Sequence, residues 1–237
     1  MDRARPSLLL LAAVFSLNTA CGQIDLPLTL ALQGENSISL LIPIFPPGSD
    51  TFSSTLVGGA EATVSLDLDP FHLFSPNGLV AMISLDRVLI AGTDIDILGL
   101  HTGTLCIYDD VANPGGGIAY LRPLRQEGDF QLNFNTLISV TDPFILSLFP
   151  DPLPFVASLD TTVPITLSDL VGLLLGGGSG GGSGGGLELA QEITSTLPTE
   201  LPILGGGNVT ANLTLATVET FPADPLLTEC EDFLAGL

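Results

Sequence analysis

Basic residues are almost missing from this sequence. Its 237 residues include five lysines and arginines together against 26 aspartates and glutamates, which gives a formal net charge of −21. Lysine is absent, and beyond the first 22 residues the arginines are Arg87, Arg122 and Arg125. Phosphates of nucleic acids and anionic lipid headgroups are bound through lysine and arginine, so this composition excludes nucleic-acid binding and electrostatic attachment to an anionic membrane. An acidic surface can instead attract cations or basic partners.

The residue types that usually carry catalysis and bind transition metals are also scarce. The chain has two histidines, His72 and His101, and three cysteines, none of which has a close cysteine or histidine neighbour, so we expect no zinc site. Serines within 176–186 match a nucleophile motif, but both histidines precede them, contrary to the usual order. The spacing of His101, Asp109 and the serines also singles out no triad. We therefore expect a protein that is not an enzyme.

The first 22 residues have the pattern of an export signal. A short basic start is followed by an apolar run over residues 8–17, which suits a secretory signal and is short for a spanning helix. Residues 17–21 (Leu-Asn-Thr-Ala-Cys) resemble the end of a bacterial lipoprotein signal. This resemblance implies a signal peptide over 1–21 and a lipid on Cys21, which becomes the first mature residue. Cleavage after Gly22 is the alternative, and it would remove Cys21 and release a free secreted protein.

Alternation of apolar and polar residues dominates the sequence beyond the signal. Period-two alternation is typical of half-buried strands, and a continuously apolar run is typical of a strand covered on both faces. Alternating segments lie at 24–32, 38–44, 64–68 and 209–215, and a more continuously apolar segment lies at 79–91. Eight or more short strands with turn signals between them predict one all-β domain over 22–237. We expect a single antiparallel β-sandwich or a barrel-like domain with a few short helices.

Three segments favour short helices. They are 168–175, 187–196, and a segment that begins at Asp224, where an aspartate followed by proline is typical of a helix start. Between the first two, residues 176–186 consist of glycine interrupted only by two serines, as in flexible linkers. We interpret this run as a flexible loop within one domain, because the tail after it is too small for a core of its own.

Cys106 and Cys230 remain after the signal is removed. Two leftover cysteines in an oxidising compartment usually pair, so we predict a disulfide between them. A bridge across so long a loop would stabilise the fold by up to about 4–5 kcal/mol, because it restricts the unfolded chain. Two separate buried thiols are the alternative.

Paired carboxylates are candidate calcium ligands. Asp67 with Asp69, and Asp94 with Asp96, are each expected on one face of a strand, and calcium takes six to eight oxygen ligands. No calcium-binding loop motif is present, so a solvated strand face is the alternative for both pairs. Calcium is the one cofactor that the sequence suggests.

Two functions fit these observations. The first is an exported, lipid-anchored, non-catalytic β-domain at the periplasmic face, outer membrane or cell surface, acting as an interaction or structural module through its polar, acidic face. The second is a carrier or binding protein for an apolar ligand or lipid, because the inward strand faces are almost wholly apolar. Candidate lining residues for the carrier are Phe130, Phe134, Phe144 and Phe149. A continuous internal cavity would favour the carrier, and a solid core the module.

Overall fold

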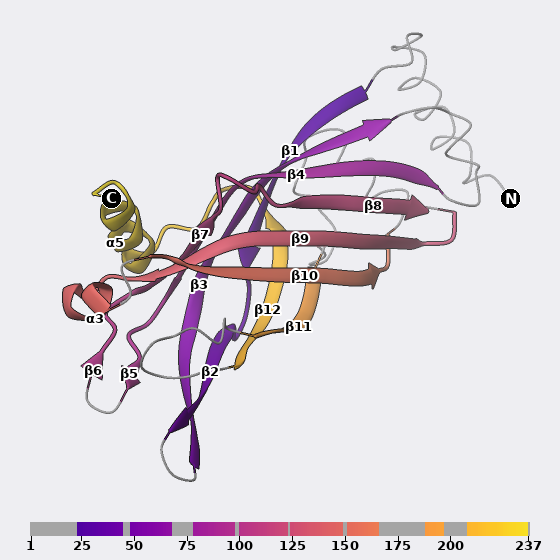
Figure 1. Ribbon diagram of the computed structural model, residues 1–237. Coiled ribbons are helices and arrows are strands. Elements are labelled where there is room, and N and C mark those ends of the chain that lie inside the picture. Colours follow the sequence, from indigo (N-terminus) through magenta and orange to yellow (C-terminus); the bar gives the residue numbers. More distant parts are fainter. Residues whose placement is uncertain are drawn as a thin grey trace, which may run out of the picture.

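The computed structural model of the chain (Figure 1) describes residues 23–44, 48–67, 78–97, 100–122, 124–148, 151–165, 188–196 and 208–236. Several predictions fall outside these ranges: the export signal with Cys21, Asp69, His72, Phe149, the helix at 168–175 and the glycine-rich loop at 176–186.

The described residues are mostly in strands, as the alternating pattern predicts. The strands are β1 (Gln23–Leu32), β2 (Ser37–Ile44), β3 (Gly48–Asp67), β4 (Leu79–Gly92), β5 (Asp96–Ile97), β6 (Leu100–His101), β7 (Leu105–Asp109), β8 (Gly116–Arg122), β9 (Glu127–Val140), β10 (Leu153–Val163), β11 (Glu188–Thr196) and β12 (Asn208–Val218). The described residues also form two helices, α3 (Pro143–Leu148) and α5 (Pro225–Leu234). The predicted all-β class with few short helices is therefore confirmed.

The long strands form one antiparallel sheet that closes into a barrel. Across the sheet the order is β11–β12–(β1 and β2)–β3–β4–(β7 and β8)–β9–β10, where the strands in brackets share one position. Both β1 and β2 pair with β3 along its length, so they act as one interrupted strand, and β7 and β8 do the same between β4 and β9. The two end strands, β10 and β11, contact each other. The architecture is therefore a closed barrel and not a sandwich.

A buried asparagine fills the gap between β1 and β2. The side-chain amide of Asn36 donates to the carbonyl oxygen of Gln33 at 3.0 Å, and its oxygen accepts from the backbone amide of Thr214 at 2.6 Å. Thr214 lies on β12 and pairs with β11 on one side; on its other side it faces the gap between β1 and β2. Asn36 thus supplies the acceptor that an unbroken strand would have supplied, which keeps a buried amide satisfied.

The barrel interior is formed by the inward half of each alternating strand. Along β9 and β10, buried and exposed positions alternate almost without exception. Leucines from five strands are each at most 2% exposed there: Leu30, Leu66, Leu79, Leu132 and Leu159. Burial of one such side chain stabilises the folded state by roughly 1.5–3 kcal/mol, so the interior is the main source of stability.

A second apolar cluster lies outside the barrel, beneath α5. We call it the α5 patch, and its buried members are Leu89, Ala91, Cys106, Leu227 and Cys230. It explains the continuously apolar run at 79–91, because the second half of β4 is covered by the barrel interior on one face and by α5 on the other.

Close packing under α5 also requires a glycine on β3. Gly58 has a φ of +124°, and a Cβ atom there would lie 2.3 Å from the carbonyl oxygen of Leu89 and 3.0 Å from the side chain of Leu227. A larger residue at this position would therefore push α5 away from the barrel, and its backbone would be strained as well.

The two helices start in the same way. Asp224 caps α5 by accepting a hydrogen bond from the amide of Leu226 at 2.9 Å, with proline in the first turn, so the predicted helix start is confirmed. Asp142 accepts hydrogen bonds from the amides of Phe144 and Ile145, both at 3.0 Å, at the start of α3. Helix α3 was not predicted, although Asp142 followed by proline is the same start signal.

The predicted helix at 187–196 was wrong, because β11 occupies this segment. All nine residues of β11 pair with β12, with Ile193 opposite Ala211. The apolar spacing of the segment fits a helix as well as a strand, and the pairing with β12 decides between them. β-branched residues such as Ile193 and Thr194 also favour the pleated surface.

Candidate functional site

A small cavity lies inside the barrel, among the residues that the structure describes. Its volume is about 20 Å³, and it is lined by apolar side chains, including Leu56, Val88 and Phe134. One water molecule needs roughly 10–15 Å³ measured in this way, so the cavity is about the size of a single water. Among the predicted lining residues, Phe130 and Phe134 are 5% and 6% exposed and pack in the core, whereas Phe144 lies on α3 and is 57% exposed.

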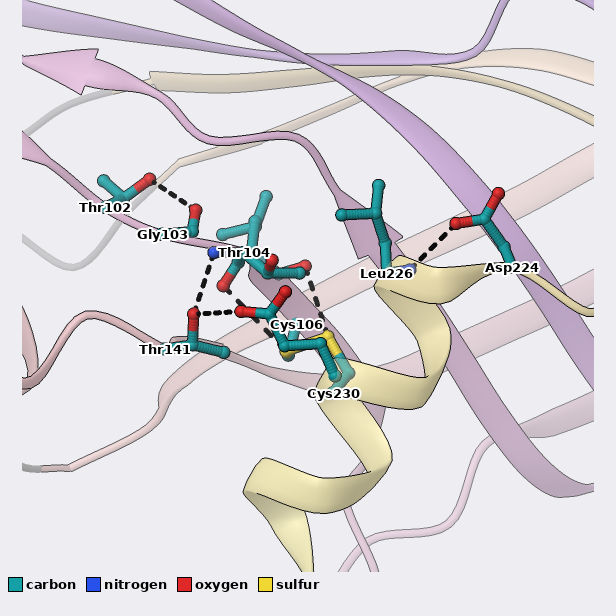
Figure 2. The surroundings of a disulfide bond; sticks show 10 residues. Thr102, Gly103, Thr104, Cys106, Thr141, Asp224, Leu226 and Cys230 are labelled. Atoms are coloured by element: carbon teal, nitrogen blue, oxygen red, sulfur yellow. Dashed lines mark hydrogen bonds between the residues drawn. A yellow bond between two sulfur atoms is a disulfide. The ribbon is translucent and has the colours of Figure 1, made fainter.

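A disulfide joins Cys106 on β7 to Cys230 on α5, as the sequence predicts (Figure 2). The two Cα atoms are 5.6 Å apart, and both residues are fully buried. Thr141, which follows β9, adds a polar link: its hydroxyl accepts from the amide of Thr104 at 2.9 Å and donates to Glu229 of α5 at 3.0 Å. The C-terminal helix is therefore fixed to β7 by a covalent bond and to β9 through a hydroxyl.

An open groove runs along the outer surface beside α5. We call it the α5 groove; its volume is about 550 Å³, within the range of ligand-binding pockets. Its lining residues come from three sources. The strands supply Leu89, Tyr108 and Leu137, the helix supplies Glu231 and Leu234, and the loop after β7 supplies Asp110 and Val111. Because these segments are far apart in the sequence, the groove exists only when α5 is seated on the barrel.

The cation in the α5 groove is already bound. Arg87 donates a hydrogen bond to Glu231 of α5, lies 3.8 Å from a carboxylate oxygen of Glu61, and stacks over the ring of Phe221 at 4.8 Å from its centroid. These contacts fix α5 to the barrel wall from outside. They also leave Arg87 poorly suited to bind an anionic ligand, because two carboxylates already neutralise it.

Two further carboxylates line the groove, one at the end of β7 and one at the start of the loop after it. Asp109 accepts a hydrogen bond from the amide of Val88 at 3.4 Å. Asp110 accepts from the side chain of Asn113 at 2.9 Å and from the amide of Ala112 at 3.0 Å, and these bonds lower the pKa of Asp110. With Glu231 included, the groove has three carboxylates against one guanidinium. Partial burial of the phenol raises the pKa of Tyr108, so it remains neutral at physiological pH.

His101 pairs with Asp94, and this pair braces the β5–β6 hairpin. His101 Nδ1 lies 2.6 Å from one carboxylate oxygen of Asp94, and the other oxygen accepts from the amide of Gly103 at 3.0 Å. The hydrogen bond with Asp94, and the charge of that carboxylate, raise the pKa of His101. Desolvation acts to raise the pKa of Asp94, but the bonds from His101 and Gly103 outweigh it and lower that pKa.

The hydroxyl closest to this pair is also engaged within the hairpin. Thr102 Oγ1 lies 3.3 Å from Asp94 and accepts from the amide of Ile95 at 2.9 Å. Asp109, which the sequence offered as a partner for His101, instead lies beside Val88 in the α5 groove. The His101–Asp94 pair therefore holds a turn together.

The candidate calcium ligands lie in separate places. Asp67 ends β3 and is opposite Gln23, whereas Asp94 follows Thr93, whose amide bonds to Thr55 in the first half of β3. Asp67 comes 12 residues after Thr55 along this strand, a span of roughly 40 Å. Within the described ranges, no group of three or more histidine, cysteine, aspartate or glutamate side chains could hold a metal ion.

Comparisons with protein-family models, curated proteins and solved structures give no significant match to this chain. In the part of the chain that the structure describes, no helix has both the length and the apolar character needed to cross a membrane. The α5 groove therefore has to be interpreted from its own geometry. No sequence pattern indicates the groove, since Arg87 is only an interruption of an apolar strand and Val111 an ordinary loop residue.

Proposed function

We propose that this protein is an exported, non-catalytic interaction module, held at a membrane through a lipid on Cys21. The observation that carries the proposal is the contrast between two hollows among the described residues: the cavity inside the barrel is about 20 Å³, and the α5 groove on the outside is about 550 Å³. A carrier of an apolar ligand needs its space inside, sheltered from water. A module that binds a partner needs an accessible surface, and the α5 groove offers one.

Export is supported by two features that do not depend on each other. The N-terminal pattern resembles a lipoprotein signal, and a buried disulfide is consistent with an extracellular location. The outward strand positions also suit an aqueous compartment, since hydroxyls and carboxylates pair across strands there. Thr63 donates to Asp86, Ser65 donates to Asp25, and Thr162 donates to Asp129, at 2.6, 2.6 and 2.8 Å.

The proposed anchor would fix the orientation of the barrel. Gln23 begins β1 only two residues after Cys21, and two residues span at most about 7 Å. A lipid on Cys21 would therefore hold the start of β1 against the bilayer. Figure 1 shows α5 and β7 at a distance from the start of β1. The α5 groove would then be presented away from the bilayer, where a partner can reach it.

The anchor can be tested by mass and fractionation in the native host. We expect the mature chain to begin at Cys21 with the mass of attached acyl chains and to sediment with membranes. A Cys21→Ala variant is expected in the soluble fraction, whereas a Gln23→Ala control, which keeps the cysteine, should remain with the membranes. A native chain that begins at Gln23, without a lipid and in the soluble fraction, would contradict the proposal.

The module can be separated from the carrier by lipid analysis. Purified protein extracted with organic solvent is expected to release no stoichiometric fatty acid, because the chains on Cys21 are covalently attached and stay with the protein. Delipidated protein is also expected not to bind a fluorescent fatty acid. Saturable binding of one fatty acid per chain would favour the carrier instead.

A further inference from the structure

We propose that the α5 groove binds a basic segment of a partner protein, with an arginine or lysine side chain lying along it. This inference rests on the proposed interaction module and names the chemistry of its partner. The aliphatic stem of the side chain would lie on Tyr108 and Leu137, and its cationic head would reach Asp109 and Asp110. The following observations support this occupant over others.

The groove offers apolar surface for the stem of an arginine or lysine side chain and carboxylates for its charged head. Arginine and lysine bury their methylene stems on apolar surface and keep the charged head near water. Leu137 and Leu234 provide apolar surface, and the phenol ring of Tyr108 can also attract a cation through its face. Val111, 84% exposed at the rim, adds an apolar contact for a neighbouring residue of the partner. A purely apolar ligand would leave the carboxylates of the groove desolvated.

Charge complementarity indicates that the occupant comes from another protein. The described residues contain three arginines, and acids hold each of them: Arg87 by Glu61 and Glu231, Arg122 by Glu127 and Asp129, and Arg125 near Glu127. The whole chain has no lysine and a net charge of −21, so two copies repel each other. A foreign basic segment therefore fits the groove better than a second copy does.

The test uses the full mature chain and two short peptides. Fluorescently labelled Leu-Arg-Leu-Arg amide is the probe, and Leu-Glu-Leu-Glu amide is its counterpart, with binding followed by anisotropy. We expect saturable binding of the arginine peptide only. Binding should weaken severalfold between about 0.05 and 0.5 M NaCl, because salt screens exposed charges. Absence of arginine-peptide binding, or equal binding of both peptides, would overturn the proposal.

A pair of double variants then locates the site. Asp109→Asn with Asp110→Asn keeps the hydrogen-bond acceptors of the loop and removes two charges, so we expect affinity for the arginine peptide to fall about five- to tenfold. The control is Asp25→Asn with Asp86→Asn. It removes the same charge from positions that bond to strand hydroxyls outside the groove. An equal loss in both double variants would mean general attraction to an acidic surface and would refute a groove site.

Localisation and peptide binding are separate measurements, so their failures can be distinguished. The Cys21→Ala variant, purified from the soluble fraction, is expected to bind the arginine peptide with unchanged affinity. If the native chain proves to be unlipidated and still binds the peptide at Asp109 and Asp110, the anchor is wrong and the groove site holds. If the native chain is lipidated and the peptide does not bind, the groove site is wrong.

Discussion

The barrel interior and the α5 patch are both buried apolar clusters, but the chain builds them in different ways. The interior is enclosed by strands that pair in one antiparallel sheet and meet where β10 contacts β11, and its side chains come from the inward half of an alternating pattern. The α5 patch is covered by a single ten-residue helix, which is held by one disulfide, a capping aspartate and an ion pair. Many weak, distributed contacts define the first region, and a few strong, discrete ones define the second.

Strand β4 belongs to both regions and shows how they are coupled. Val88 and Ile90 point into the barrel, and Leu89 and Ala91 lie beneath α5. Loss of the helix would expose the outer pair and leave the inner pair enclosed. We therefore predict that α5 can be weakened without opening the barrel, whereas damage to the interior destabilises both regions.

The largest expected effect comes from breaking the disulfide. Replacing Cys106 and Cys230 by alanine, or reducing the bridge, should lower the free energy of unfolding by about 4–5 kcal/mol, because the bridge closes a loop of more than 100 residues. Urea denaturation of the oxidised protein and of the double variant measures this loss. A loss under about 1 kcal/mol would show that the unfolded chain is already compact there.

A truncation in the barrel interior should rank second. Leu132 is 2% exposed on β9, between paired strands that cannot collapse into a void. Leu132→Ala is expected to lower the free energy of unfolding by about 3–4 kcal/mol. Met82→Ala, at a 56% exposed position of β4, is the control and should change stability by less than about 0.5 kcal/mol.

The matching truncation in the α5 patch should lower the free energy of unfolding by less. Leu227 is 3% exposed, so Leu227→Ala would leave a cavity beneath α5. Because α5 can shift toward the barrel and partly fill this cavity, we expect the free energy of unfolding to fall by only about 2 kcal/mol. Replacement of exposed Asp232 in the same helix is the control. If Leu227→Ala lowered the free energy of unfolding as much as Leu132→Ala, the two regions would be equally rigid, and the expected difference between them would be wrong.

Removal of the helix cap should have a smaller and more local effect. Asp224→Ala deletes the acceptor for the amide of Leu226 and is expected to cost about 1 kcal/mol, whereas Asp224→Asn keeps an acceptor and should cost less. Hydrogen exchange gives the spatial readout: amides of α5 should exchange faster in Asp224→Ala, and those of β9 should not. Equal acceleration in both elements would mean that α5 and the barrel open together.

The smallest effect is a pH dependence confined to the β5–β6 hairpin. The pKa of His101 is raised in the folded state, so its pairing with Asp94 contributes stability below the unfolded histidine pKa of about 6.5 and loses it as pH rises through the folded pKa. The lowered pKa of Asp94 sets the acid limit, where its contribution is lost as pH falls. NMR titration should give His101 a higher pKa than the same histidine in urea. Asp94→Asn should reduce the difference, and the charges of Asp96 and Asp142 should keep a smaller part of it.

The sequence predicted the parts of the fold that depend on local pattern. Period-two alternation defines the inward residues of the barrel, Asp224 followed by proline marks the start of α5, and two leftover cysteines predict the disulfide. Closure into a barrel was not predictable, because it depends on whether β10 and β11 meet. The strand at 188–196 was missed for a related reason: its partner, β12, is decided by pairing across the sheet and not by spacing within the segment.

The α5 groove was beyond sequence reasoning because it depends on a contact between distant segments. Glu231 of α5 meets Arg87 of β4 across 144 positions of the chain. Asp109 and Asp110 are recognisable in the sequence as an acidic turn, but nothing local places them beside the C-terminal helix. A groove whose two sides come from distant segments can be recognised only after the fold is known.

The covalent link between β7 and α5 also governs what happens when the chain is cut. Cys106 and Cys230 are separated by 124 positions, and strands β8 to β12 lie between them. A protease that cleaves one bond anywhere in this stretch leaves two pieces that remain joined by the bridge and by strand pairing. Such a nicked molecule should run as one band on a gel until a reductant is added. Under non-reducing conditions, the barrel can therefore lose chain continuity and remain assembled.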